Sequence, residues 1–196
     1  MYSPHTRPLH SITWLAVKGK AADAVCSDLD LRAGMAITRP RRFALEGAMS
    51  DAGWYLIVAD GRDHRLIQAP VLTKLSAGCE VLTCSVDDRT LSSAATGWRD
   101  GRRLWSVTYE GEESPGDVVA EGELPVTFAI IRQELTAKSK AEDAGDLLLD
   151  PLFEIAIEAV RNAVGYRPDE PSPAFDGRFV MLDAIHPTMM QRLFGG

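Results

Sequence analysis

The stretch SSAATGWRDGRRLWSVTY, residues 92–109, contains the strongest structural signal in the chain. Asp100 and Gly101 separate two runs with strand-like alternation, and Asp-Gly in that position favours a type I′ turn. This turn places Arg99 opposite Arg102 across the hairpin. An unbroken register then predicts one largely apolar face, composed of Trp98, Arg103, Trp105, Val107 and Tyr109. We expect this face to be covered, either by the core of the same chain or by a partner.

The segments before the hairpin predict further strands. Residues 12–17 are apolar on both faces, and residues 53–61, GWYLIVADG, form a continuous apolar run typical of a central strand covered on both sides. Residues 80–88, EVLTCSVDD, alternate and lead directly into the hairpin, which predicts three successive strands in a meander. We therefore expect a mainly antiparallel sheet of about five or six strands, with an edge strand near residues 42–45.

Two long helices are predicted after the hairpin. Residues 125–140 begin with a proline and carry apolar side chains at helical spacing. Residues 150–165 are bounded by Asp150 as the N-cap and by Gly165 just past the end. Both helices are expected to pack on one face of the sheet, which makes the fold a single α+β domain. Shorter helices are predicted over residues 21–29 and 70–76.

Composition divides the chain into three parts. Residues 1–10 are predicted to be a flexible leader, residues 11–170 the α+β domain, and residues 171–196 a proline-linked extension that is too apolar for a solvated tail. The apolar side chains of the extension must be buried, on the same domain or on a second subunit. A homodimer whose copies exchange this extension is compatible with the pattern. These side chains include Phe179, Val180, Leu182, Met189, Met190, Leu193 and Phe194.

The overall composition is that of an ordinary globular protein, since 45% of the 196 residues are hydrophobic and 25% are charged. The 3 cysteines make an odd count, which favours the reducing cytoplasm over an oxidising compartment. No apolar run approaches the ~20 residues needed to cross a bilayer, so no membrane partner is expected. A net charge of -7 disfavours nonspecific attraction to nucleic acid.

The search for catalytic chemistry is mostly negative. The common signatures of phosphate loops, nucleophile elbows, zinc proteases and dinucleotide-binding folds are absent from the sequence. We therefore expect no catalytic residue, no metal site and no cofactor. His64 is the one histidine with an acidic neighbour, Asp63, and it is either a weak general-base candidate or a plain surface histidine.

Two charged segments are candidate binding sites. Arginines and tryptophans gather at the hairpin, where the arginine forks suit a phosphate or carboxylate group. Residues 110–123 carry acidic side chains and no basic one, so this stretch is either a solvated loop or a lip for a basic partner. The candidate binding residues are Trp98, Arg99, Arg102, Arg103, Trp105, Glu112, Glu113 and Asp117.

Five segments together resemble a group of bacterial proteins of unknown function: ITWLAVKGK, GWYLIVADG, LSAGCEVLTCSVDD, GWRDGRRLWSVTYEG and AVGYRPDE. The resemblance covers most of residues 11–170 and implies no particular activity, so it assigns no functional residue. In its size, its acidity and its aromatic β-hairpin the chain is also similar in style to small immunity proteins that neutralise bacterial toxins.

These observations favour a nonenzymatic, cytoplasmic protein-binding module, with immunity as one form of that function. The binding surface would be a face of the sheet or the acidic stretch at residues 110–123. The alternative is a small-molecule binder or enzyme with a pocket between the hairpin and the helix at residues 150–165. A protein partner or a homodimer is favoured over nucleic acid.

Overall fold

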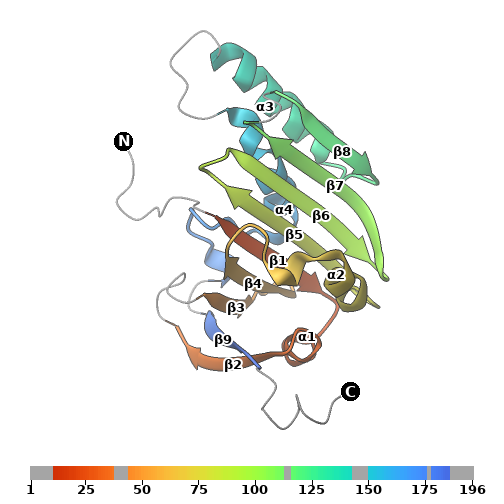
Figure 1. Ribbon diagram of the computed structural model, residues 1–196, viewed down its shortest axis with the longest axis vertical. Coiled ribbons are helices and arrows are strands. Elements are labelled where there is room, and N and C mark those ends of the chain that lie inside the picture. The colour runs from red at the N-terminus through yellow and green to blue at the C-terminus, as the bar shows by residue number, and fades with distance from the viewer. Residues whose placement is uncertain (1–10, 38–43, 113–115, 143–149, 176–177, 186–196) are drawn as a thin grey trace.

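One antiparallel sheet organises the molecule (Figure 1). The computed structural model describes residues 11–37, 44–112, 116–142, 150–175 and 178–185. These residues form a 9-stranded sheet in the order β2-β9-β3-β4-β1-β5-β6-β7-β8, and all neighbouring strands are antiparallel. The strands are β1 (Ile12–Lys18), β2 (Leu31–Ala36), β3 (Leu45–Met49), β4 (Trp54–Asp60), β5 (Glu80–Asp87), β6 (Ser92–Arg99), β7 (Arg102–Glu110), β8 (Val118–Gly122) and β9 (Val180–Ala184).

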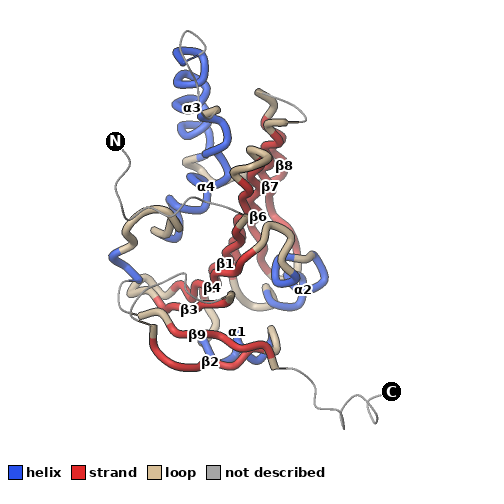
Figure 2. The backbone as a smooth tube through the Cα atoms, turned by 60° about the vertical axis from the view of Figure 1, so that its left-hand side comes forward, coloured by secondary structure: helices blue, strands red, loops and turns tan. Residues whose placement is uncertain are grey.

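The described helices cover the sheet on both sides (Figure 2). The long helices α3 and α4 pack on one face, where α4 contacts β5, β6 and β7. The shorter helices α1 and α2 bury a second apolar cluster against the other face. The predicted α+β domain with an antiparallel sheet is confirmed, and the shorter helices add a second covered face. The helices are α1 (Ala22–Asp28), α2 (Ala69–Leu75), α3 (Phe128–Glu142) and α4 (Ile155–Val164), with 3-10 turns η1 (Arg65–Ile67), η2 (Pro151–Glu154) and η3 (Pro173–Phe175).

The sheet is wider than the sequence predicted, because β2, β8 and β9 add to the expected strands, and β9 of the C-terminal extension lies between β2 and β3. This arrangement makes β3 an internal strand, although an edge strand was expected close to it. The predicted leader at residues 1–10 lies outside the described residues, as do Met189, Met190, Leu193 and Phe194.

The local turn and cap predictions are confirmed. Asp100 and Gly101 have φ values of 51° and 75°, as a type I′ turn requires. Asp150 accepts a hydrogen bond from the backbone N–H of Leu152 and so caps the 3-10 turn that leads into α4. Gly165 ends α4 in the left-handed conformation with φ 74°.

The prediction that Trp98, Trp105 and the other apolar side chains share one face of the hairpin is wrong, because the strand register shifts. Trp98 lies opposite Arg103 as expected, but Gly97 lies opposite Trp105, which leaves Leu104 as the extra residue of a β-bulge. A one-residue shift reverses the face of every following side chain. Trp98 therefore joins the apolar cluster under α1 and α2, whereas Trp105 joins the cluster under α3 and α4.

Candidate functional site

The sheet face that points away from α3 and α4 is only partly covered (Figures 1 and 2). α2 lies near the turn of the hairpin, where Trp98 is buried in one cluster with Leu72 and Leu75. No helix of the described chain lies over the rest of this face along β6, β7 and β8. We call this part the open face, and its side chains are Ala94, Thr96, Ser106, Thr108, Val119 and Glu121.

Hydroxyl groups on the open face bond to one another and to neighbouring groups. The Oγ1 atoms of Thr83 and Thr96 are 2.6 Å apart, and Nε1 of Trp98 donates to Thr96 Oγ1 over 2.9 Å. Ser106 Oγ donates to Oε2 of Glu121 over 3.5 Å. Short side chains that are paired in this way form a polar sheet surface, which suits contact with another macromolecule better than enclosure of a small molecule.

The two tryptophans predicted to line a binding site are core residues. Trp98 is 8% exposed and Trp105 is 6% exposed, on opposite faces of the sheet. α4 packs directly on β6 and β7 where Trp105 is buried. Side-chain packing therefore occupies the space between the hairpin and α4, where the alternative hypothesis expected a pocket.

The three hairpin arginines lie at the surface in different surroundings. Arg99 is paired with Arg102 across the turn, and an ion pair with Glu80 at 3.2 Å relieves the repulsion between them. Arg103 lies on the same face as Trp98 and is 3.7 Å from Glu121. The hairpin arginines are therefore divided between two faces and two acidic partners, and they do not converge on one anion site.

The acidic stretch contains β8, the last strand at one end of the sheet. Glu112, Asp117, Glu121 and Glu123 are all exposed, and we call these residues the acidic edge. Glu121 contacts Arg103 and Ser106, whereas the other three side chains have no hydrogen bond or ion pair within the described residues. Glu110 belongs elsewhere, since it forms an ion pair with Arg62, and the predicted site residue Glu113 lies outside the described residues.

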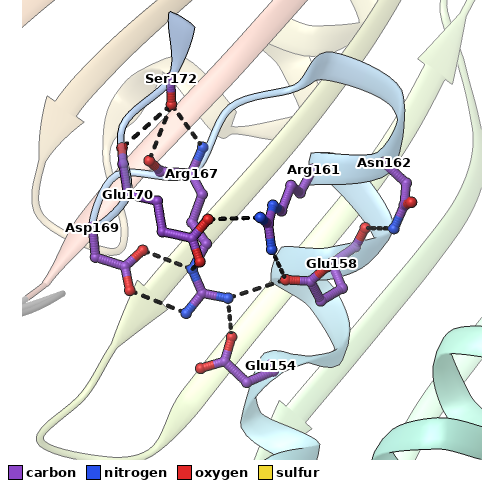
Figure 3. Close-up of polar contacts among 8 residues, drawn as sticks. All are labelled: Glu154, Glu158, Arg161, Asn162, Arg167, Asp169, Glu170 and Ser172. Atoms are coloured by element: carbon purple, nitrogen blue, oxygen red, sulfur yellow. Dashed lines mark hydrogen bonds and ion pairs between the residues drawn. The ribbon is translucent and has the colours of Figure 1, made fainter.

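Arg167, just after α4, is the centre of an ion-pair network (Figure 3). Its guanidinium donates to Asp169 over 2.7 and 3.1 Å, to Glu158 over 3.1 Å, and to Glu154. Burial alone would lower the pKa of Arg167, but the hydrogen bonds to Asp169 and Glu154 outweigh burial and raise it. The network ties the segment after α4 to the helix. In the sequence this network corresponds to two glutamates four residues apart, Glu154 and Glu158, followed by Arg-Pro-Asp-Glu at residues 167–170.

A groove of about 470 Å³ lies between α3 and α4. Ile130 and Glu134 line its α3 side, and Glu158, Arg161 and Asn162 line its α4 side. Arg161 is ion-paired with Glu158 at 3.0 Å, so this part of the wall is balanced in charge. None of the predicted site residues lines the groove.

Burial shifts the pKa of several groups inside the described domain, among them His64 and Cys84. Nδ1 of His64 accepts a hydrogen bond from the backbone N–H of Leu66 over 3.4 Å, and burial lowers the pKa of this histidine. Burial raises the pKa of the fully buried Cys84 thiol. In the described residues no group of three or more His, Cys, Asp and Glu side chains could hold a metal ion. No helix in this part of the chain is long and apolar enough to cross a bilayer.

The open face and the acidic edge meet at Glu121, which belongs to both. Together they form one surface along β6, β7 and β8 that is polar in the middle, carries Arg103 beside Glu121, and is negatively charged at Glu112, Asp117 and Glu123. Comparison of the chain with models of protein families, with curated proteins and with solved structures found no match.

Proposed function

We propose that this chain is a nonenzymatic, cytoplasmic protein-binding module that holds a basic protein with the acidic edge and the adjoining open face. The observation that carries the proposal is uncompensated charge, because Glu112, Asp117 and Glu123 are exposed and have no ionic partner in the described chain. Complementary charge of this kind speeds the encounter with a basic partner and selects against acidic competitors.

Other properties of the chain support a protein partner. The net charge of -7 and the acidic edge both repel the phosphates of nucleic acid. Cys26, Cys79 and Cys84 are all free and buried, which suits a reducing compartment such as the cytoplasm. Because the hydroxyl side chains of the open face are short, a partner can approach the strands closely.

Neutralisation of a bacterial toxin is the form of protein binding that we propose. The support is the similarity in style to immunity proteins, together with an acidic surface that would cover a basic one. A toxin that acts on nucleic acid needs a basic surface to bind its substrate, and the acidic edge is complementary to such a surface.

Reversal of the charge at the acidic edge tests the proposal. The variant Glu112→Lys/Asp117→Lys changes two exposed side chains without described partners, so its stability should stay near that of the wild type. Native mass spectrometry of the complex isolated gently from the host should show a species heavier than the 21.4 kDa chain for the wild type. The charge reversal should reduce the bound fraction about tenfold or more.

The matched control is Asp60→Lys/Asp63→Lys, which makes the same change in net charge at two exposed sites outside the acidic edge. The control variant should keep the partner. Equal binding by the wild type and by both variants would contradict the proposal, and so would equal loss in both, since the second result indicates only an effect of net charge.

The groove between α3 and α4 supports a second candidate function, that of a small-molecule binder. Its volume of about 470 Å³ lies within the range of ligand pockets. A bound metabolite should raise the stability of the fold, by about 2.7 kcal/mol at a hundredfold excess over Kd. A thermal-shift screen across metabolite pools measures this, and Asn162→Ala in the groove wall should abolish any real shift.

A further inference from the structure

β8 is an edge strand with one free side. Its inner side pairs with β7 from Tyr109↔Val118 to Trp105↔Gly122 without a break. Its outer side has no strand partner among the described residues (Figure 1). In an antiparallel ladder, alternate residues of an edge strand direct both the N–H and the C=O groups outward. These groups are a template for an additional strand.

The two ends of the sheet differ in their protection against such pairing. At the far end, the pairing of β2 with β9 is irregular between Ala33 and Ala36, and a bulge of this kind disfavours the addition of a strand. The pairing of β8 with β7 has no register shift, and only its last residue, Gly122, leaves the extended conformation, with φ 82°. From Val118 to Glu121 the protection of β8 consists of charge. The negative charge of the acidic edge disfavours pairing with an acidic strand or with β8 of a second copy, but favours pairing with a basic strand.

The side chains of β8 alternate between two environments. Val118 and Ala120 are partly buried and pack against the cluster under α3 and α4. Val119, which is 59% exposed, and Glu121 lie on the open face. A strand added to β8 would therefore place one set of its side chains beside apolar neighbours and the other set beside Val119 and Glu121. An alternation of apolar and basic residues satisfies both environments, because a lysine stem packs on valine while its ammonium group reaches the carboxylate.

A second copy of the chain does not suit the two environments beside β8. Pairing of β8 with β8 of another copy brings the two acidic edges together, and like charges at this distance repel. The charge of the edge thus distinguishes a basic partner from self-association.

We propose that β8 accepts an extended segment of the basic partner as an additional antiparallel or parallel strand, with alternating apolar and basic side chains. This inference rests on the proposed function and states how the partner is held. Backbone hydrogen bonds along β8 supply affinity, and the acidic edge, with Glu121 on β8 itself, supplies selectivity.

The test uses a short capped peptide of alternating lysine and valine as the probe, with the full-length chain. Hydrogen exchange read at single residues should slow at least about tenfold at the outward-facing amides of β8 when the peptide is bound. Two further peptides carry N-methyl groups, on all valines or on all lysines, with the charge unchanged. Only alternate residues of an added strand point toward β8, so one methylated peptide should lose binding and the other should keep it.

Glu121→Lys should weaken binding of the probe about tenfold or more, whereas the exposed control Asp63→Lys should leave it unchanged. Equal binding of both methylated peptides, or no protection of β8 amides, overturns strand addition. In that case loss of the cellular partner in Glu112→Lys/Asp117→Lys still supports the proposed function, so the two failures are distinguishable. Protection of β8 that rises with protein concentration in the absence of peptide also overturns the inference, because the occupant is then a second copy.

Discussion

The indole of Trp105 covers Gly97 so closely that a β-carbon added to Gly97 would lie 2.0 Å from Nε1 of the tryptophan. The contact exists because the bulge at Leu104 places Trp105 opposite Gly97 in the hairpin. Only glycine fits at position 97, because the indole ring of Trp105, which is 6% exposed, occupies the place of a side chain. This contact therefore holds the register that separates Trp98 from Trp105.

Gly97→Ala should lower the free energy of unfolding by about 3 kcal/mol, at the upper end of the usual cost of overpacking, because a rigid ring must move. Urea denaturation measures the change. Gly34→Ala is the control, since the nearest side-chain atom there is the flexible Cε of Met181 at 3.0 Å. A cost for Gly97→Ala no larger than that for Gly34→Ala would contradict the prediction.

Arg167→Met should destabilise the fold by about 2 to 4 kcal/mol, because it leaves Glu154, Glu158 and Asp169 without their shared cation. The matched control is Arg178→Met, which breaks the exposed ion pair with Asp51 and should cost less than about 1 kcal/mol. Chemical denaturation of both variants makes the comparison. Addition of Glu158→Gln to Arg167→Met should recover part of the loss, and no recovery would argue against a charge effect.

Tyr109→Phe should remove a hydrogen bond to Asp150, at a cost of about 1 kcal/mol at neutral pH. Burial, followed by this hydrogen bond, raises the pKa of Tyr109 from 10.0 to about 12. The contribution is therefore complete below pH 10 and is lost as the pH rises through the folded-state value of about 12. Unfolding measured from pH 8 to pH 12 should show the wild type losing its advantage over the variant, and a constant difference would contradict this.

Asp87→Asn should reduce stability at neutral pH and lose this effect in acid. The hydrogen bond from Arg89 is the main reason that the pKa of Asp87 falls from 3.8 to about 2. A lowered folded-state pKa contributes stability above the unfolded value of 3.8 and loses it as the pH falls toward 2. The difference in unfolding midpoint between wild type and variant should shrink between pH 4 and pH 2. Arg89→Gln should show the same pH dependence, and a difference between the two variants would identify another partner of Asp87.

The sequence predicted those turns and helix ends that depend on only a few neighbouring residues. The Asp100-Gly101 turn, the Asp150 cap and the Gly165 terminus were all predictable, because each depends on the backbone preference or hydrogen bonding of one or two residues. The central strand β4 followed from its uninterrupted apolar run.

The candidate site was predictable only in part. The acidic stretch at residues 110–123 was evident, but the position of β8 at the end of the sheet depends on how all the other strands are ordered. The burial of Trp98 and Trp105 was not predictable, because aromatic side chains on a strand serve a core and a binding surface equally well. Burial, which distinguishes the two, is a property of the packed molecule.

By itself, the sequence determined the α+β class, the antiparallel meander, the type I′ hairpin and the ends of α4. These features depend on turn geometry, capping and hydrophobic periodicity, which are properties of residues close together in the chain. Only the tertiary structure decided that β9 lies between β2 and β3 and that Trp98 and Trp105 occupy opposite faces. The same is true of the Arg167 network, which gathers carboxylates from both sides of Gly165. The physical reason is that strand order, register and ion pairing depend on contacts between distant residues, and such contacts are selected by packing of the whole chain.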